Sequence, residues 1–380
     1  MMDASWSDPM IIRDEVHGTI EFDALEGRII DSAPFQRLRR IKQMSITNLV
    51  YPGANHTRFE HSLGTAHLSW VIAKKLGLDD EAARQVKLYG LLHDIGHSAF
   101  SHEGEDVIAP FTGGHEKAGR KRILEGEIAD ILSENYDPKE IADTERSAYG
   151  SIISSDLGSD RMDYLKRDAL NTGVAYGIID IDRLVHTMTM EEGELCITKG
   201  GLEAAEYLLV GRFMMFSAVY LHKTVRIATA MLYRAIESAL DDGTISPQML
   251  SIMDDDEAYA AMKRSEGSKR YVDALLHRRL FKEICSIPKE GWGLKRAKAV
   301  GKKVSDKIGS EIIIDYPRGF FKQVSLKVKT EDGLRQITGI SKLVRSLKAS
   351  EEDRLGVLVL SEAGTRDAFQ ERIKRLVASS

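Results

Sequence analysis

Leu91-Leu92-His93-Asp94-Ile95-Gly96-His97 closes an apolar helical run with an adjacent histidine and aspartate. His61 lies upstream, within residues 58–64, and Asp160 lies downstream, within residues 159–164. Two imidazoles and two carboxylates form a mixed nitrogen and oxygen ligand set, which suits a divalent metal ion that activates water against a phosphate. The pattern therefore indicates a metal-dependent phosphohydrolase built on helices.

Each of these residues also has a structural explanation when it is taken alone. A buried histidine is more often a satisfied core residue than a ligand, and Ser159-Asp160 ahead of a helical run is also an ordinary N-cap. The adjacent pair is harder to explain by packing, because burying Asp94 without a counter-charge costs several kcal/mol. A metal ion supplies that counter-charge.

Composition places the chain among ordinary globular proteins. Its 380 residues suffice for one large domain or two of ordinary size, with 29% charged and 43% hydrophobic residues. The net charge of −5 argues against a general nucleic-acid binder, although a local basic pocket can still bind a nucleotide.

The two cysteines and the lengths of the apolar runs indicate the cellular compartment of the protein. Cys196 and Cys285 lie far apart and in no ligand spacing, which excludes a disulfide framework and a thiolate zinc site. Residues 1–10 lack the apolar core of a signal peptide, and no apolar run reaches spanning length. We therefore predict a cytoplasmic protein without a membrane segment.

Hydrophobic periodicity predicts a mainly α fold. Apolar residues recur at spacings of three and four over residues 63–76, with Gly77 as the stop, and over residues 86–92, which end at the His-Asp pair. The proline-free residues 202–240 predict a third long helix.

The character of the chain changes after about residue 245. Short β-type runs occur there, at residues 311–316, 323–328 and 355–360, before an amphipathic helix at 366–378. We predict a helical domain over residues 1–245 and a smaller α+β lobe over residues 246–380, packed together rather than tethered.

Three further histidines follow the His-Asp pair: His97, His102 and His115. General acid-base catalysis on a phosphate ester needs groups that titrate near neutrality, and histidine is the usual choice. His115, in Gly113-Gly114-His115-Glu116, can equally be a loop residue.

Together these motifs resemble the HD-domain phosphohydrolases, whose metal motif is H…HD…D. More narrowly, the chain resembles the deoxynucleoside triphosphate triphosphohydrolases, a branch with dGTPase-like enzymes and the vertebrate SAM-and-HD-domain dNTPase. The matching stretches are residues 35–43, 59–64, 93–102, 160–168 and 220–223. The resemblance runs from about residue 10 to beyond residue 340, and it implies an HD-domain helical core.

The resemblance implies hydrolysis of a dNTP, with dGTP as one candidate, to the deoxynucleoside and inorganic triphosphate by attack at the α-phosphorus. The implied ligands of the divalent metal (Mn, Mg, Fe, Zn or Ni) are His61, His93, Asp94 and Asp160. His97 would stabilise charge on the α-phosphate, His115 would protonate the departing 5′-oxygen, and His102 belongs to the same catalytic group. Glu105 stands where the family often has Asp.

A triphosphate carries about four negative charges, so its pocket needs cations. The candidates are Arg58, Arg161, Arg212 and Lys223, with Tyr164 and Tyr220 as hydrogen-bond donors. Arg212, Phe216 and Tyr220 are spaced i, i+4, i+8 along one helix face. Taken alone, that face fits core aromatic residues beside a snorkelling arginine, and Phe216 stands where the vertebrate enzyme has His.

Selection for deoxyribose falls, by the same resemblance, to Gln43, Met44, Tyr164, Asp168 and Tyr220. Gln43 and Asp168 can hydrogen-bond a 3′-hydroxyl, whereas Met44 would pack beneath C2′ and leave no space for a 2′-hydroxyl. The vertebrate enzyme has Leu at that position. Because Met is longer and more adaptable, we expect looser discrimination against ribonucleotides.

Asp31, Gln36 and Arg39 match positions that bind a regulatory guanine nucleotide in the vertebrate enzyme. An aspartate and an arginine can read a guanine edge, but these residues fit a solvated helix start equally well. Met10 stands where that enzyme has a phosphate-binding Lys. The family also implies a homo-oligomer (dimer, tetramer or hexamer).

Other partners and functions remain open from the sequence. The basic run from Lys295 to Lys307 fits a solvated helix face or a phosphate-binding surface, and its only nearby aromatic residue, Trp292, gives little support for nucleic-acid stacking. Alternatives are an HD-family nucleotidase or phosphodiesterase acting on other nucleotides, or a nucleotide-sensing homologue with little turnover. The Gly-Tyr-Pro-type motif of the cyclic dinucleotide branch does not follow the HD signature here, and all catalytic histidines are present.

Overall fold

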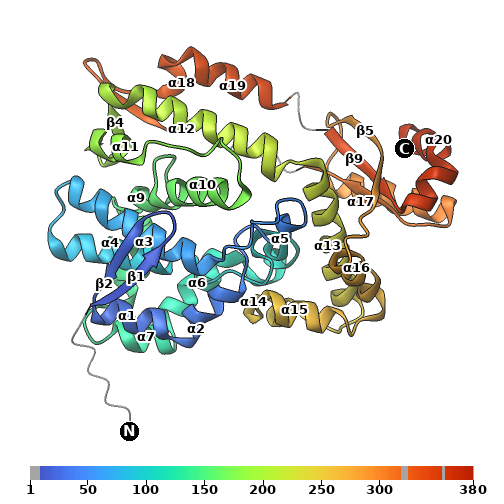
Figure 1. Cartoon of the computed structure of the whole chain (residues 1–380), viewed down its shortest axis with the longest axis horizontal. Coiled ribbons are helices and arrows are strands. Elements are labelled where there is room, and N and C mark those ends of the chain that lie inside the picture. Colours follow the sequence, from blue (N-terminus) through green and yellow to red (C-terminus); the bar gives the residue numbers. More distant parts are fainter. Residues whose placement is uncertain (1–8, 318–323, 353–355, 380) are drawn as a thin grey trace, which may run out of the picture. The chain divides into compact units, whose positions relative to one another are not determined.

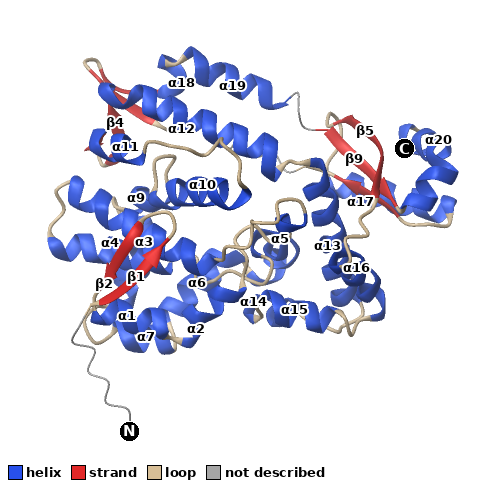
Figure 2. Cartoon of the chain, in the orientation of Figure 1, coloured by secondary structure: helices blue, strands red, loops and turns tan. Residues whose placement is uncertain are grey.

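The structure, a computed structural model, describes residues 9–317, 324–352 and 356–379. Among these residues helices dominate and the strands gather in three small sheets (Figure 2), which confirms the predicted mainly α class. Two compact units share the chain. Unit 1 comprises the described residues up to 215, 246–258 and 324–344, and unit 2 comprises those of 216–245, 259–323 and 345–380. The division into domains at residue 245 stays a prediction.

Unit 1 is built around α3 (Arg58–Lys75), α4 (Asp80–Leu92) and α10 (Ser159–Thr172), with α4 and α10 both packed on α3. A β-hairpin of β1 (Met10–Asp14) and β2 (Gly18–Phe22) precedes these helices (Figure 1). The hydrophobic core beneath them includes Phe22, Ile29, Phe35, Leu63, Leu91 and Leu92. The shorter helices of unit 1 are α1 (Ala24–Asp31), α2 (Ala33–Gln36), α5 (Ser101–Thr112), α6 (Gly114–Leu124), α7 (Glu127–Leu132), α8 (Pro138–Asp143), α9 (Gly150–Ser154), α11 (Ile181–Thr187), α14 (Pro247–Ile252) and α18 (Ile337–Ile340).

The two helices predicted around the His-Asp pair are confirmed. A capping box of Thr57 and Glu60 starts α3 five residues earlier than the apolar pattern, and Gly77, at φ +80°, follows its end. Asp79 caps α4 by accepting from the Ala82 amide at 2.8 Å. The helix then ends at Leu92 with His93 as its C-cap, so the end of α4 determines where His93 and Asp94 lie.

The single helix predicted over residues 202–240 is wrong. Residues 202–215 form α12 (Leu202–Met215), a π-helical turn, η5 (Phe216–Tyr220), follows, and α13 (Lys223–Asp241) begins anew with His222 as its cap. A π turn bonds i to i+5 and shifts the helical phase, so the regular i, i+4, i+8 face expected for Arg212, Phe216 and Tyr220 is interrupted, although the Phe216 and Tyr220 rings still lie 4.8 Å apart. No glycine or proline marks this break.

Among the described residues no single helix is long and apolar enough to span a membrane, and only α12 and α13 taken together, with their flanking turns, reach that length and composition.

A four-stranded sheet belongs to unit 1, in the order β3 (Met188–Glu191), β4 (Glu194–Thr198), β7 (Lys327–Thr330) and β8 (Gly333–Gln336). β4 and β7 pair in parallel, whereas the two hairpins are antiparallel. The run predicted at 323–328 therefore starts later, at Lys327, and Gln323 lies outside the described residues.

Unit 2 contains an antiparallel sheet in the order β5 (Lys282–Pro288), β9 (Gly356–Ser361) and β6 (Ile312–Asp315). The helices α17 (Leu294–Ile308) and α20 (Ala363–Ala378) pack on this sheet and on each other, around Val300, Val304, Val357, Val359 and Ile373. The predicted strands at 311–316 and 355–360 and the final helix are confirmed, with Leu355 outside the described residues. α16 (Glu266–Leu276) packs on α13, and α15 (Asp255–Met262) and α19 (Lys342–Glu352) complete the helices.

Candidate metal centre and catalytic histidines

Four side chains from three helices meet in unit 1, and we call them the metal cluster: His61, His93, Asp94 and Asp160. His61 lies in the first turn of α3, the pair follows α4, and Asp160 lies in the first turn of α10. His61 Nε2 is 3.1 Å from Asp160 Oδ1 and 3.6 Å from Asp94 Oδ2. His93 Nε2 is 3.4 Å from Asp94 Oδ1 and 3.8 Å from Asp160 Oδ1. The fold thus brings all four predicted ligands together.

The two imidazoles are oriented as metal ligands are. His61 Nδ1 is bonded to Asp163 Oδ2 at 2.7 Å, and His93 Nδ1 to the Gly90 carbonyl at 2.8 Å. Because Nδ1 of each ring must donate to these oxygens, Nε2 presents a lone pair to the cluster. Both Nε2 atoms are buried and make no well-directed hydrogen bond within the described residues. These unsatisfied atoms beside two carboxylates fit a divalent metal ion.

Electrostatics support the same interpretation. Burial alone would raise the pKa of Asp94, but Arg58, His93 and His97 hold it well below its usual value. Burial would lower the pKa of His61, yet Asp160, Asp163 and Asp94 raise it to about 10. The cluster therefore stabilises a positive charge strongly, and a divalent cation can replace the proton that it would otherwise retain.

The metal cluster is closed on one side and open on the other. The side chains of His61 and Asp94 expose only 1% and 6% of their surface, whereas Asp160 exposes 34%. A catalytic metal needs open positions for water and substrate, in contrast to a closed structural site. The open side lies at Asp160.

A buried network behind His61 was missed by the sequence analysis. Asp163 also accepts from Arg167 at 2.9 Å and is bonded to His17 Nε2 at 2.7 Å, and Arg167 in turn reaches Asp14 at 2.9 Å. A Cβ on Gly64 would lie 1.9 Å from Asp163 Oδ1, so only glycine permits this approach of α3 to α10. The signal was present as Asp163 three residues after Asp160, but its role depends on how the two helices pack.

A second group, the histidine cluster, comprises His97, His102, Glu105 and His115. The His97 and His115 rings stack with centroids 4.0 Å apart, and His102 stands edge-on to His97 at 4.8 Å. Glu105 is bonded to His115 Nδ1 at 2.8 Å and to His102 Nδ1 at 3.2 Å. The structure thus brings the three predicted catalytic histidines together, and it places Glu105 between two of them.

The two residues before His102 have an uncommon backbone conformation. Phe100 and Ser101 both have left-handed conformations, with φ of 62° and 55°, which are costly for residues other than glycine. Asp255 accepts from the Phe100 amide at 2.7 Å, and Ser101 Oγ donates to the Lys42 carbonyl at 2.7 Å. These contacts hold the turn at the start of α5.

The pKa values of the histidines in this cluster are shifted in opposite directions. Burial lowers the pKa of His97 well below its usual value, with Arg58 adding to the effect, whereas the His102 side chain is exposed. Burial would also lower the pKa of His115, but Glu105 outweighs it and raises that pKa. His115 is therefore the histidine of this cluster whose pKa is shifted toward the protonated form that a general acid needs.

The predicted phosphate-binding arginines lie near these clusters in unit 1. Arg58 is buried, with Nη1 paired to Asp94 and Nη2 without a hydrogen-bond partner in the described structure. Arg161 and Arg212 both pair with Asp156, which also accepts from the Ser325 amide at 2.6 Å.

The predicted sugar-binding residues divide between the units. Met44 is buried, and Tyr164 and Asp168 follow Asp160 at i+4 and i+8 on α10. Tyr220 belongs to unit 2, where it contacts Phe216. Lys223, predicted to bind phosphate, also belongs to unit 2 and pairs with Glu283 at 3.0 Å. Their part in a substrate site stays a prediction.

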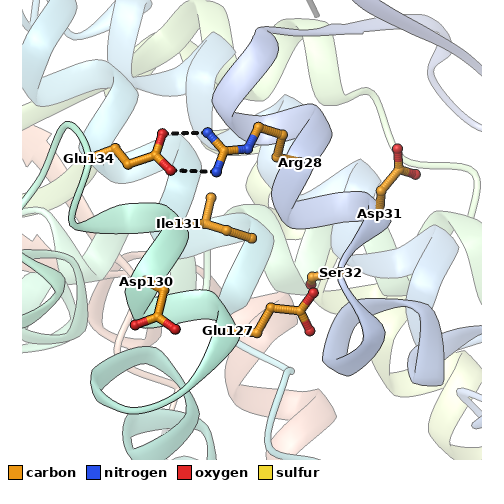
Figure 3. A pocket seen from close by; sticks show the side chains of 7 residues that line it. All are labelled: Arg28, Asp31, Ser32, Glu127, Asp130, Ile131 and Glu134. Atoms are coloured by element: carbon orange, nitrogen blue, oxygen red, sulfur yellow. Dashed lines mark hydrogen bonds and ion pairs between the residues drawn. The ribbon is translucent and has the colours of Figure 1, made fainter. Parts of the chain in front are cut away.

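The predicted regulatory residues lie at α1 and the turns after it. Asp31 lines a pocket of about 500 Å³ between α1 and α7, with Arg28 bonded to Glu134 across it (Figure 3). The other lining residues include Glu127 and Asp130, so the pocket is acidic and unsuited to phosphates. Gln36 accepts from Arg39 Nε at 2.9 Å, and Arg39 lies over the Phe59 ring. A guanine nucleotide at these residues stays a prediction.

Comparison with known families agrees with the geometry. The family model described as the HD domain matches residues 58–168, and the one described as the HD associated region matches residues 179–378, more than half of the chain. This chain belongs to the HD-domain phosphohydrolase family. The predicted resemblance is thereby confirmed, and the H…HD…D residues fall within the HD-domain match.

Similar proteins add detail without fixing a substrate. An uncharacterised protein of Methanocaldococcus jannaschii is 38% identical over 359 residues, covering 90% of this chain and 76% of that protein. The Dictyostelium discoideum SAMHD1 homologue, named a deoxynucleoside triphosphate triphosphohydrolase, is 29% identical over 63% of this chain, and the match covers 51% of that protein. A solved phosphohydrolase structure from Bacteroides thetaiotaomicron superposes with a TM-score of 0.75 at 25% identity, over 93% of this chain and 99% of that one.

Proposed function

We propose that this HD-domain phosphohydrolase is a dNTP triphosphohydrolase, which converts a dNTP, with dGTP as a candidate, into the deoxynucleoside and inorganic triphosphate. The observation that carries the proposal is the face of α10. Asp160, in the metal cluster, is followed on the same face by Tyr164 and Asp168, because residues four apart are neighbours along a helix. Each such step is about 6 Å. A nucleotide whose α-phosphate lies at Asp160 can therefore extend its sugar toward Asp168.

The named Dictyostelium relative supports a dNTP rather than another nucleotide. Three cationic side chains near the clusters, Arg58, Arg161 and Arg212, supply charge for a triphosphate. A monophosphate would need fewer of them.

In the proposed reaction a water oxygen bonds to the α-phosphorus, and the bond from that phosphorus to the 5′-oxygen breaks. A divalent ion held by the metal cluster would supply Lewis-acid stabilisation of the α-phosphate and activate the water. His97 donates one N–H to the phosphate, and His115 protonates the 5′-oxygen. Glu105 holds the His115 ring by its Nδ1, which leaves Nε2 for the leaving group. The proton that the water loses restores the histidine cluster.

We further propose that the chain acts in the cytoplasm as a homo-oligomer, and that a guanine nucleotide regulates it at Asp31, Gln36 and Arg39. The acidic surroundings of Asp31 and the Met10 substitution weaken phosphate binding there, so activation by GTP is expected to be small. Light scattering with and without GTP measures the oligomer and its response.

The decisive experiment incubates metal-replete protein with each of the four dNTPs, with and without GTP, and separates the products by anion exchange. Inorganic triphosphate and deoxynucleoside in equal amounts are expected. Release of pyrophosphate or monophosphate instead would make the chain an HD-family nucleotidase or phosphodiesterase. Tight dNTP binding without any product would favour the nucleotide sensor.

A further inference from the structure

One histidine outside both clusters contacts the two residues assigned to the sugar 3′-hydroxyl. His56 Nε2 is 2.7 Å from Asp168 Oδ1, and the His56 carbonyl accepts from the Gln43 amide at 3.0 Å. Gln43 and Asp168 are 125 positions apart in the chain and lie on different elements of unit 1. His56 therefore joins the two halves of a proposed hydroxyl site.

The backbone around His56 is held by a short ladder. Lys42 and Thr57 form an antiparallel bridge, and the Arg58 amide donates to the Ile41 carbonyl at 2.9 Å. Gln43 thus stands opposite His56 beside this isolated bridge, and the segment that holds His56 leads directly into α3. The position of the Gln43 backbone depends on that of His56.

The same loop presses against the end of α10. A Cβ on Gly53 would lie 2.4 Å from the Asn171 carbonyl oxygen, which is too close for any other residue without movement. Asn171 lies one turn beyond Asp168 on α10. The loop from Gly53 to His56 therefore contacts the C-terminal part of α10 at two points. Gly53 lies against Asn171, and the His56 ring is bonded to Asp168.

The ring of His56 has a single favourable orientation. Its side chain exposes 2% of its surface, and that of Asp168 exposes 4%. A carboxylate oxygen only accepts, so Nε2 must carry the proton, while Nδ1 is buried without a hydrogen-bond partner in the described structure. An unprotonated Nδ1 in that place costs less than a buried N–H without an acceptor. His56 therefore acts as a fixed donor to Asp168.

The side chain of Gln43 adds a second observation. Its Oε1 atom is buried and has no hydrogen-bond partner among the described residues. Buried polar atoms in native proteins are nearly always paired, by protein, water or ligand. A 3′-hydroxyl that donates its proton to the Asp168 carboxylate can accept only from the side-chain N–H of Gln43. Turning the amide by 180° exchanges the buried Oε1 for that N–H group, so a single 3′-hydroxyl can then bond with both residues.

We propose that His56 is a positioning residue for recognition of the 3′-hydroxyl. Its ring holds Asp168, and its backbone carbonyl holds the Gln43 backbone by accepting from the N–H, so one residue fixes both. The inference rests on the proposed function, since it assumes that a deoxynucleotide sugar lies between these residues. It adds that selectivity for a 3′-hydroxyl depends on a side chain that does not touch the substrate.

The test compares dGTP with 2′,3′-dideoxy-GTP, which lacks only that hydroxyl. The ratio of their kcat/KM values and the ratio of their Kd values, measured by calorimetry on metal-replete protein, both report hydroxyl recognition. In His56→Ala the dGTP values are expected to weaken by about 10- to 100-fold, while the dideoxy values change little. The preference for dGTP then collapses toward one.

Two variants separate positioning from a general loss of structure. His56→Gln places an amide N–H near the position of Nε2 and is expected to retain the preference. His56→Asn reaches only the position of Nδ1 and is expected to lose it, which also covers a failure of His56→Ala to fold.

The inference is overturned if the dGTP preference of His56→Ala or His56→Asn equals that of the unmodified protein, or if dGTP and its dideoxy analogue weaken equally. These ratios do not depend on which product forms. If the unmodified protein releases monophosphate rather than triphosphate, the proposed function fails while the ratios still decide the role of His56.

Discussion

The metal cluster and the histidine cluster use the same kinds of side chain in different proportions. In the metal cluster two imidazoles face two carboxylates, with the carboxylate of Asp163 directly behind His61. In the histidine cluster three imidazoles surround one carboxylate, that of Glu105. Arg58, buried and paired with Asp94, lowers the pKa of His97.

The proportion of carboxylate to imidazole decides what each cluster can do. An excess of negative charge raises the pKa of His61 to about 10, which is the mark of a place that stabilises a cation. In the other cluster burial lowers the pKa of His97, and only His115, bonded to Glu105, has a raised pKa. The ligand atoms of both groups lie close enough together to hold an ion, but the balance of charge favours a metal ion in the metal cluster and proton transfer in the histidine cluster.

Removing a metal ligand should have the largest effect. Asp160→Ala is expected to lower dNTP hydrolysis at least about 1,000-fold, because several kcal/mol of charge stabilisation depend on the metal. Asp160 is partly exposed, so the melting temperature should stay unchanged. Product release, bound metal and a melting curve measure these effects. Asp182→Ala, which removes an exposed carboxylate from the first turn of α11, is the matched control. Turnover retained by the metal-replete Asp160→Ala protein would remove Asp160 from the site.

Neutralising Glu105 should act only on the histidine cluster. Glu105→Gln is expected to lower kcat about 10- to 100-fold at neutral pH and to leave metal binding intact. Glu105 raises the pKa of His115, so the protonated donor is present below that pKa and is lost as pH rises through it. Without the carboxylate the alkaline limb of the kcat/KM profile should move to lower pH. An unmoved limb would mean that His115 is not the proton donor.

Changing the residue behind His61 should affect only the metal cluster. Asp163→Asn keeps an acceptor for His61 Nδ1 but removes the charge, and metal affinity is expected to fall about 10- to 100-fold. Arg167 retains Asp14 as a partner, which limits the structural damage. A competition titration with a metal chelator gives the affinity. If the pH profile changed and the affinity did not, the two clusters would not be independent.

The smallest expected effect is that of Gly64→Ala on the free energy of unfolding, through the packing of α3 on α10. Gly64→Ala places a methyl group against Asp163, and it should destabilise the fold by about 1–3 kcal/mol, as overpacking typically does. Gly339→Ala, where a Cβ meets no atom within 4 Å, is the control in the same unit. Thermal unfolding followed by circular dichroism compares them, and equal stabilities would mean that α3 and α10 can separate freely.

The sequence could place each residue of the metal cluster because these residues mark helix ends. His61 follows a capping box, and the His-Asp pair follows an apolar helix, which local patterns reveal. His17 and Asp163 could not be assigned in this way. Their roles arise only when α10 packs on α3, and a single sequence does not report which helices meet.

The helix predicted over residues 202–240 failed for a different reason. A π turn needs no glycine or proline, and its residues, Phe216–Tyr220, are as apolar as their neighbours. The hairpin of β3 and β4 was also missed, although Glu192-Gly193 between them is an ordinary turn signal, with φ of 53° and 77°. In that case the signal was present in the sequence and was not used.

The interleaving of the two units has a consequence for truncation. A fragment ending at residue 245 would contain every proposed metal ligand, yet it would lack Asp255, which fixes the Phe100 turn, and Ser325, which bonds Asp156. It would also lose β7, the parallel partner of β4. Such a fragment should fold poorly, whereas a chain nicked by protease near residue 245 should stay assembled. Recombination that exchanged residues 1–245 without the segments holding Asp255 and Ser325 should therefore disrupt the phosphohydrolase site, because these later residues bond to the backbone and side chains around it.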